Sequence, residues 1–164
     1  MSVATPPQIA SQRDLVLADL ARLLTVEATL ARVVLPDLRR RVSDQELAET
    51  LEEHLAETRE HASSIAWAFE QLGERPAGTE APGLDGLRSE QQEIADVAPE
   101  LRDSFAAGAA LGGEHYEIAV YSSVLPVVSK VSPGGVFETL RRNLEQEFTA
   151  MRKLETIAER LASG

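Results

Sequence analysis

The chain contains no cysteine, and this absence excludes disulfide bonds, zinc sites built on thiolates and cysteine nucleophiles. Long apolar stretches are missing too: no run approaches the roughly 18 unbroken apolar residues of a membrane-spanning helix. The first twelve residues, MSVATPPQIASQ, lack the charged start and the apolar core of a signal peptide. We therefore expect a soluble, cytoplasmic protein that does not enter a membrane.

Positive charge is also scarce, which argues against nucleic-acid binding. Asp and Glu number 27 against 16 Lys and Arg, and the formal net charge of −11 repels phosphate backbones. The one basic run, Arg39-Arg40-Arg41, is expected near a helix C-terminus, where positive charge is stabilising.

Few aromatic residues, 4% of the chain, together with abundant Ala, Leu, Glu and Arg favour helices over strands. A length of 164 residues suits one domain with a sizeable core. We expect an all-α protein with a flexible N-terminus over residues 1–12 and a single domain over residues 13–162.

Apolar residues recur with a period near 3.6 in four segments, which predicts four long helices. Their expected ranges are about 13–42, 43–73, 99–125 and 132–162. Pro36 is expected to kink the first helix and Pro126 to end the third. Ser43 with Glu46 forms a capping box for the second helix, and the Ser132-Pro133 pair predicts the start of the fourth.

The connection between the second and third helices is much longer than the other two. Residues 73–83, GERPAGTEAPG, are rich in helix breakers, and residues 84–96 are expected to form a short extra helix. The segment is long enough to run the length of the bundle, whereas the other connections suit antiparallel hairpins. One long crossover predicts the ferritin-like topology among four-helix bundles.

Each long helix carries polar residues in the middle of its apolar stripe, where a charge is costly. A lone glutamate in such a position usually reaches solvent, and a lone histidine is usually a hydrogen-bonded core residue. Here all four helices show the same feature. The candidate residues are Glu27, His54, Glu57, His61, Glu114, Glu117 and Glu147.

Four converging carboxylates would repel one another unless protons or cations neutralise them, and the stripes contain no Lys or Arg at this level. Glu27 and Glu57 are 30 residues apart and Glu114 and Glu147 are 33 apart, as two similar helical hairpins would give. Carboxylate and imidazole ligands suit iron or manganese, as in the ferritin-like carboxylate proteins. The pattern thus indicates a site for two metal ions.

Several stretches give the chain a specific resemblance over residues 14 to 160. The most specific are LRDSFAAGAALGGEHYEIAVYSSV and AFEQLGERPAG, and TVEATLARVVLPDL, LEEHLAETREH and LEQEFTAMRKL add to them. The chain resembles the YciF-like ferritin-like family of bacterial stress-associated proteins. The resemblance implies a ferritin-like bundle, a homodimer and a dinuclear iron site, with matching residues at Glu27, His54, Glu57, Glu114, His115, Glu117 and Glu147.

Some positions depart from the pattern of that family. Met151 stands where relatives have Asp, His61 where Gln is common and Ala56 where Glu is common. The Glu-x-x-His pair of ferritin-like sites is absent after both Glu57 and Glu147. These departures concern mainly the fourth helix and predict one well-held metal ion and a second, weaker one.

Two functional hypotheses follow. In the first, two ferrous ions are bridged by Glu57 and Glu147, with Glu27 and Glu114 as terminal ligands, and oxygen or peroxide is reduced in a ferroxidase- or peroxidase-like reaction. In the second, the chain is a degenerate, non-enzymatic bundle that acts as a dimeric structural or interaction protein. A histidine phosphotransfer bundle fits poorly, since His54 lies in the apolar stripe and not on a solvated face.

Overall fold

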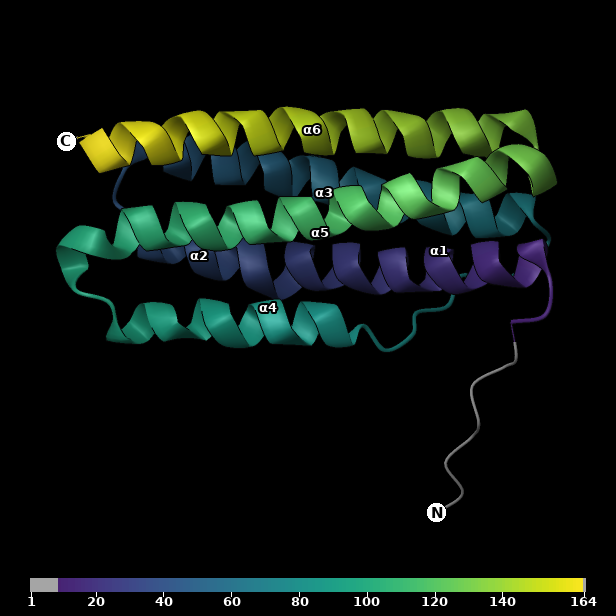
Figure 1. Ribbon diagram of the computed structural model, residues 1–164, viewed down its shortest axis with the longest axis horizontal. Coiled ribbons are helices and arrows are strands. Elements are labelled where there is room, and N and C mark those ends of the chain that lie inside the picture. Colours follow the sequence, from purple (N-terminus) through teal and green to yellow (C-terminus); the bar gives the residue numbers. More distant parts are fainter. Residues whose placement is uncertain (1–8, 164) are drawn as a thin grey trace, which may run out of the picture.

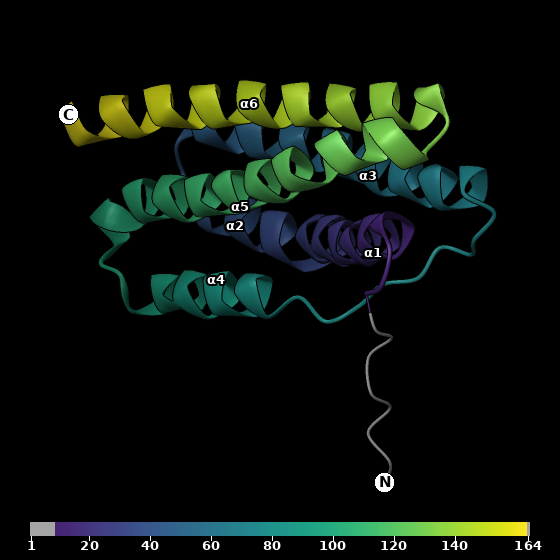
Figure 2. The ribbon, with the colours of Figure 1, turned by 45° about the vertical axis from the view of Figure 1, so that its right-hand side comes forward.

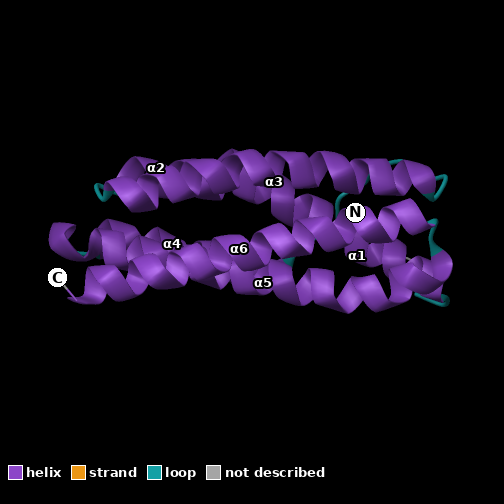
Figure 3. Ribbon diagram, turned by 90° about the horizontal axis from the view of Figure 1, so that it is seen from above, coloured by secondary structure: helices purple, strands orange, loops and turns teal. Residues whose placement is uncertain are grey.

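The computed structural model describes residues 9–163, and in this range it contains helices and no β-strand (Figures 1 and 3). The predicted all-α class is confirmed. The N-terminus expected to be flexible lies, for residues 1–8, outside the described residues. None of the helices in the described range combines the length and hydropathy needed to cross a membrane.

The elements in chain order are α1 (Gln12–Thr29), the π-helical turn η1 (Leu30–Val34), α2 (Leu35–Arg41), α3 (Gln45–Gln71), α4 (Pro82–Gln92), the 3₁₀ turns η2 (Glu93–Asp96) and η3 (Pro99–Leu101), α5 (Arg102–Val131) and α6 (Gly134–Ser163).

Four long helical segments form a bundle in which α1 continues through η1 into α2. The helix α1 contacts α3 and α5, and α6 contacts the same two helices, so the four segments enclose one core (Figures 1 and 2). Neighbouring segments run antiparallel. The connection from α3 to α5 returns along the outside of the bundle and carries α4, which confirms the predicted crossover with its short extra helix.

The short helix α4 packs closely on α5. A Cβ atom added at Gly83 would lie 2.7 Å from Cε2 of Tyr116, so only glycine allows this approach. The buried Gln91 side chain, near the other end of α4, donates a hydrogen bond to the Val34 carbonyl (3.3 Å). These contacts hold the crossover against the bundle at both ends of α4.

The first helical segment passes through a π-helical turn immediately before Pro36. The N–H of Leu35 bonds to the carbonyl of Leu30, five residues back, and α2 then begins. Proline lacks the N–H that an α-helix needs at this point, and a π turn redistributes the neighbouring hydrogen bonds. Pro36 is thus preceded by a local change from α-helix to π-helix, which begins at Leu30, three residues after Glu27.

Two predicted helix starts are wrong in detail. Asp44, not Ser43, caps α3: its carboxylate accepts a hydrogen bond from the Leu47 N–H (2.9 Å), whereas the Ser43 N–H donates to Asp103 of α5. The hydroxyl of Ser132 makes no hydrogen bond within the described residues and caps nothing, because Ser132 serves as the C-cap of α5.

The predicted end of the third long helix is also wrong. The helix α5 continues through Pro126 to Val131. Pro126 and Ser122, whose carbonyl loses its partner, are both exposed, so water can replace the missing hydrogen bond. Packing of the inward face then outweighs the local preference, because Val124, Leu125 and Val128 are buried in the core.

The core consists of two apolar halves. One half includes Leu30, Leu38, Leu47, Leu51, Ala106, Ala110, Leu154 and Ile157. The other includes Val16, Leu20, Leu23, Ile65, Phe69, Val124, Val128 and Leu140. The sequence positions of the candidate residues fall between these two sets on every helix, so a polar layer separates the halves.

Candidate metal centre

Six acidic and imidazole side chains from all four long segments converge in the polar layer. Each is at most 3% exposed. Helical spacing explains the pairs: His54 and His61 lie two turns apart on one face of α3, and Glu114 and Glu117 lie about one turn apart on α5. The six residues, which we call the polar cluster, are Glu27, His54, His61, Glu114, Glu117 and Glu147.

The polar cluster divides into two groups of potential metal ligands. His54, Glu114, Glu117 and Glu147 form a four-residue group, and in each group the nearest ligand atoms lie within 4.8 Å of one another. His54 Nε2 lies 2.9 Å from Glu114 Oε1 and 4.0 Å from Glu117 Oε2, and His54 Nδ1 lies 4.0 Å from Glu147 Oε2.

The second group contains three residues, Glu27, His61 and Glu147. His61 Nδ1 lies 2.7 Å from Glu147 Oε1 and 3.5 Å from Glu27 Oε1. Glu147 therefore belongs to both groups and has a carboxylate oxygen near each. This is the arrangement that a carboxylate bridging two ions requires.

Burial and mutual repulsion change the acid–base behaviour of the polar cluster. Burial by itself lowers the pKa of His61, but the close and negatively charged carboxylates of Glu147 and Glu27 outweigh it and raise this pKa to about 10. Burial likewise lowers the pKa of His54, but nearby carboxylates, Glu114 above all, outweigh it and raise this pKa well above its ordinary value. Both imidazoles are therefore protonated at neutral pH.

Three carboxyl groups of the polar cluster have pKa values that shift in the direction that retains protons. Burial, reinforced by the charges of Glu147 and Glu27, raises the pKa of Glu117 well above its usual range. Burial also raises the pKa of Glu27 and Glu147, although His61 partly offsets it. Among the described residues, no Lys or Arg forms an ion pair with the polar cluster, so protons and imidazolium ions supply its positive charge.

Many polar atoms of the cluster lack hydrogen bonds. His61 Nδ1 and Glu147 Oε1, although only 2.7 Å apart, have no hydrogen bond of acceptable geometry in the described part of the chain. Such buried unpaired atoms are costly, and a metal ion would satisfy them. The other unpaired atoms are Glu27 Oε2, His54 Nδ1, Glu114 Oε2, Glu147 Oε2 and both carboxylate oxygens of Glu117. This donor set of carboxylate oxygens and imidazole nitrogens fits iron or manganese.

Hydrogen bonds from neighbouring residues orient the three-residue group. The Tyr121 hydroxyl donates to Glu27 Oε1 (2.5 Å), and Asn143 Nδ2 donates to the Tyr121 oxygen (3.2 Å). The other oxygen of Glu27 stays free for a metal ion. On the far side of the ring, His61 Nε2 lies 3.1 Å from Gln146 Oε1. A ring nitrogen that donates to a carbonyl leaves the opposite nitrogen available to a metal.

Three residues next to the polar cluster, Tyr121, Asn143 and Gln146, were not among the sequence candidates. Tyr121 is fully buried in the core and also donates a hydrogen bond to a cluster carboxylate. Asn143 lies four residues before Glu147, on the same helical face, and this spacing was the available signal. Gln146 gave no comparable signal, because its partner lies on another helix.

The structure places two further sequence candidates away from the centre of the cluster. Glu57 is 36% exposed in its side chain, with Oε2 3.9 Å from His54 Nδ1, and belongs to neither ligand group. The neighbouring His54 imidazolium lowers the pKa of Glu57, so Glu57 is ionised. His115 is exposed, and Met151 is only partly buried. Glu117, rather than Glu57, completes the converging set, and the bridging role assigned to Glu57 remains a prediction.

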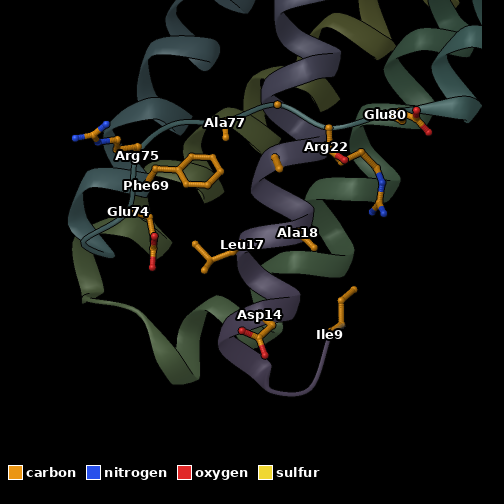
Figure 4. A pocket seen from close by; sticks show the side chains of 13 residues that line it. Ile9, Asp14, Leu17, Ala18, Arg22, Phe69, Glu74, Arg75, Ala77 and Glu80 are labelled. Carbon is orange, nitrogen blue, oxygen red and sulfur yellow. The ribbon is translucent and has the colours of Figure 1, made fainter. Parts of the chain in front are cut away.

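A surface groove lies elsewhere. It has a volume of about 550 Å³ and lies between α1, the end of α3 and the start of the crossover. Figure 4 shows Leu17 and Phe69 in this groove, with Asp14, Arg22 and Glu80 around it. None of the cluster residues lines this groove, so it is separate from the candidate metal centre.

Comparison with known proteins agrees with the sequence resemblance. Residues 11–163 match the family described as "Domain of unknown function (DUF892)". The chain belongs to this family. No curated protein matches this chain significantly.

Two solved structures resemble this DUF892 chain over nearly its whole length. The E. coli stress protein YciF is 25% identical, with a TM-score of 0.88, and the match covers 94% of this chain and 99% of YciF. YcfI from Rhodopseudomonas palustris, which carries a provisional description as a structural protein, is 28% identical with the same TM-score, and the match covers 93% and 98% of the two chains. The predicted membership of a YciF-like family is confirmed.

Proposed function

We propose that this DUF892 protein binds two metal ions in the polar cluster, iron above all and manganese as an alternative, and acts on oxygen or peroxide in protection against stress. The observation that carries the proposal is the convergence of four buried carboxylates on two imidazoles. No Lys or Arg pairs with them within the described range. Groups of this kind are rarely buried together unless cations neutralise them.

Charge balance supports two divalent ions. Two imidazolium ions and two carboxylates, with the remaining two acids protonated, make the metal-free cluster neutral. Two divalent cations that displace four protons leave four carboxylates, two neutral imidazoles and again no net charge. The raised pKa values of His54, His61 and Glu117 indicate that these residues hold protons in the metal-free protein, which bound metal ions would displace.

The residues of the cluster would take distinct roles. Glu147 would bridge the two positions, His54 with Glu114 and Glu117 would complete one, and His61 with Glu27 the other. Ferrous ions, when bound, supply the two electrons that reduce peroxide to water. The chain itself would hold the ions with its carboxylates and imidazoles, and it excludes bulk water with the apolar halves on either side.

Anaerobic titration with Fe(II), followed by elemental analysis, tests this proposal. Binding of about two ions per chain is expected, and peroxide should oxidise them faster than free Fe(II). Glu147→Gln should abolish binding at both positions. The control, Glu155→Gln, changes an exposed acid on the same helix and should behave as the parent protein. If the parent protein binds no more metal than Glu147→Gln, the proposal fails.

A second candidate function is a non-enzymatic, dimeric structural or interaction protein. It is favoured by the ability of protons and imidazolium ions to neutralise the metal-free cluster, and by Met151, whose thioether suits a hard ion poorly. Thermal unfolding separates the two functions. A ligand that binds only the native state must raise the midpoint, so an unchanged midpoint with Fe(II) or Mn(II), in a protein that is dimeric in solution, supports this second function.

A further inference from the structure

The two ligand groups are unequal, and a surface pocket lies directly beside the weaker one. The position at Glu27, His61 and Glu147 has three protein ligands and the other has four. A pocket of about 450 Å³ between α3 and α6 includes His61 in its lining. His61 thus presents Nδ1 to the metal position and Nε2 to Gln146, which is also in the pocket.

Apart from Trp67, the pocket is lined by polar and charged residues. His61 and Asn143 are buried and form the floor, and Glu60 and Arg142 are exposed at the mouth. The hydroxyls of Ser64 and Thr139 and the amide of Gln146 lie between the mouth and the floor. Oxygen atoms of carboxylate, hydroxyl and amide groups are the transient ligands that a hard divalent cation needs while it loses water.

We propose that this pocket is the passage through which a divalent metal ion reaches the three-ligand position, an inference that rests on the proposed function. The ion is first attracted by Glu60, is then passed along the hydroxyl and amide oxygens, and finally passes the edge of the His61 ring. None of the four residues of the other ligand group lines this pocket, and the four-ligand position fills more slowly.

The charged residues at the mouth determine how the rate of cation uptake should respond to substitution. Glu60 attracts cations, whereas Arg142 repels them, and long-range attraction of this kind changes association rates more than affinities. Loss of the Glu60 charge should therefore slow metal uptake, and loss of the Arg142 charge should speed it. Both effects should fade at high ionic strength because salt screens exposed charges. A passage for uncharged molecules would respond to neither substitution.

Stopped-flow uptake of Co(II), used as the probe ion, tests the passage, and release into excess chelator gives the reverse rate. Trp67 lines the pocket and is the sole tryptophan of the chain, so its fluorescence reports the ion locally. The blocking variant is Thr139→Phe, which fills the pocket without touching the cluster. The matched control is Thr156→Phe, at an exposed threonine of the same helix.

Thr139→Phe is expected to slow uptake and release of the weaker ion by about tenfold each, leaving its equilibrium affinity unchanged. This pattern separates a passage from a structural effect, since damage to the site would change the affinity. Equal rates in Thr139→Phe and Thr156→Phe overturn the passage but leave the metal centre intact, and would favour a route past the half-exposed Glu57. Absence of any Co(II), Fe(II) or Mn(II) binding by the parent protein overturns the proposed function and the passage together.

Discussion

Raising the pH of the metal-free protein from about 6.5 to about 9 is expected to destabilise it, and His61 is the main cause. Its pKa is 6.5 when the chain is unfolded and about 10 in the folded protein. The folded state thus binds one proton more than the unfolded state across this window, and stability falls as pH rises. This contribution is fully present below pH 6.5 and is lost as the pH passes through 10.

The size of the effect follows from the shift in the pKa of His61. A difference of about 3.5 units corresponds to about 5 kcal/mol, of which about 3 kcal/mol is lost by pH 9. Unfolding free energies of domains are about 5 to 15 kcal/mol, so the loss is large enough to measure. The raised pKa of Glu117 acts in the same direction. The lowered pKa values of Asp37 and Asp44 affect stability only in acid, below about pH 4.

Urea unfolding at pH 6.5, 7.5 and 8.5, with a chelator present, measures the dependence. The parent protein should lose about 1.4 kcal/mol per pH unit at the upper end, and His61→Gln should lose clearly less. Saturating Mn(II) should reverse the slope, because the metal competes with these protons. A metal-free protein whose stability is constant or rises over this range would refute the assignment of a proton to His61.

Three further outcomes are expected. Mn(II) at about one hundred times its dissociation constant should raise the thermal midpoint by about 5 to 10 °C, and calorimetry that shows no rise would contradict metal binding by the native state. Tyr121→Phe should cost about 1 to 3 kcal/mol in urea unfolding because Glu27 and Asn143 lose a buried partner; a neutral result would mean that the hydroxyl does not position Glu27. Leu140→Ala should cost about 2 to 5 kcal/mol, since the side chain is fully buried, and a smaller loss would indicate a loosely packed core.

Much of the fold could be predicted from the sequence because helical periodicity is local. The apolar stripe of α3, from Leu47 through Ile65 to Leu72, is buried as its spacing indicated. The length of the connection after α3 was enough to predict the crossover. Helix ends were less predictable: Asp44 outcompeted Ser43 as a cap, and α5 ran through Pro126, because tertiary packing overrode local preferences.

The polar cluster was partly predictable for the same reason. Six of the seven predicted ligands are buried together, since a polar residue in an apolar stripe must point inward wherever that stripe packs. Glu57 is the exception. It lies three residues from His54, close enough to the stripe to be a candidate, yet its carboxylate is left at the edge of the bundle.

The sequence by itself determined that four amphipathic helices would form and that each would turn acids or imidazoles inward, because both properties depend on the order of residues along one helix. Tertiary structure alone decided that Glu147 lies between two ligand groups, that Tyr121 orients Glu27, and that His61 separates the cluster from a pocket. These relations join atoms of different helices. They depend on the rotation and axial offset with which the helices pack, and no periodicity within a single helix encodes those quantities.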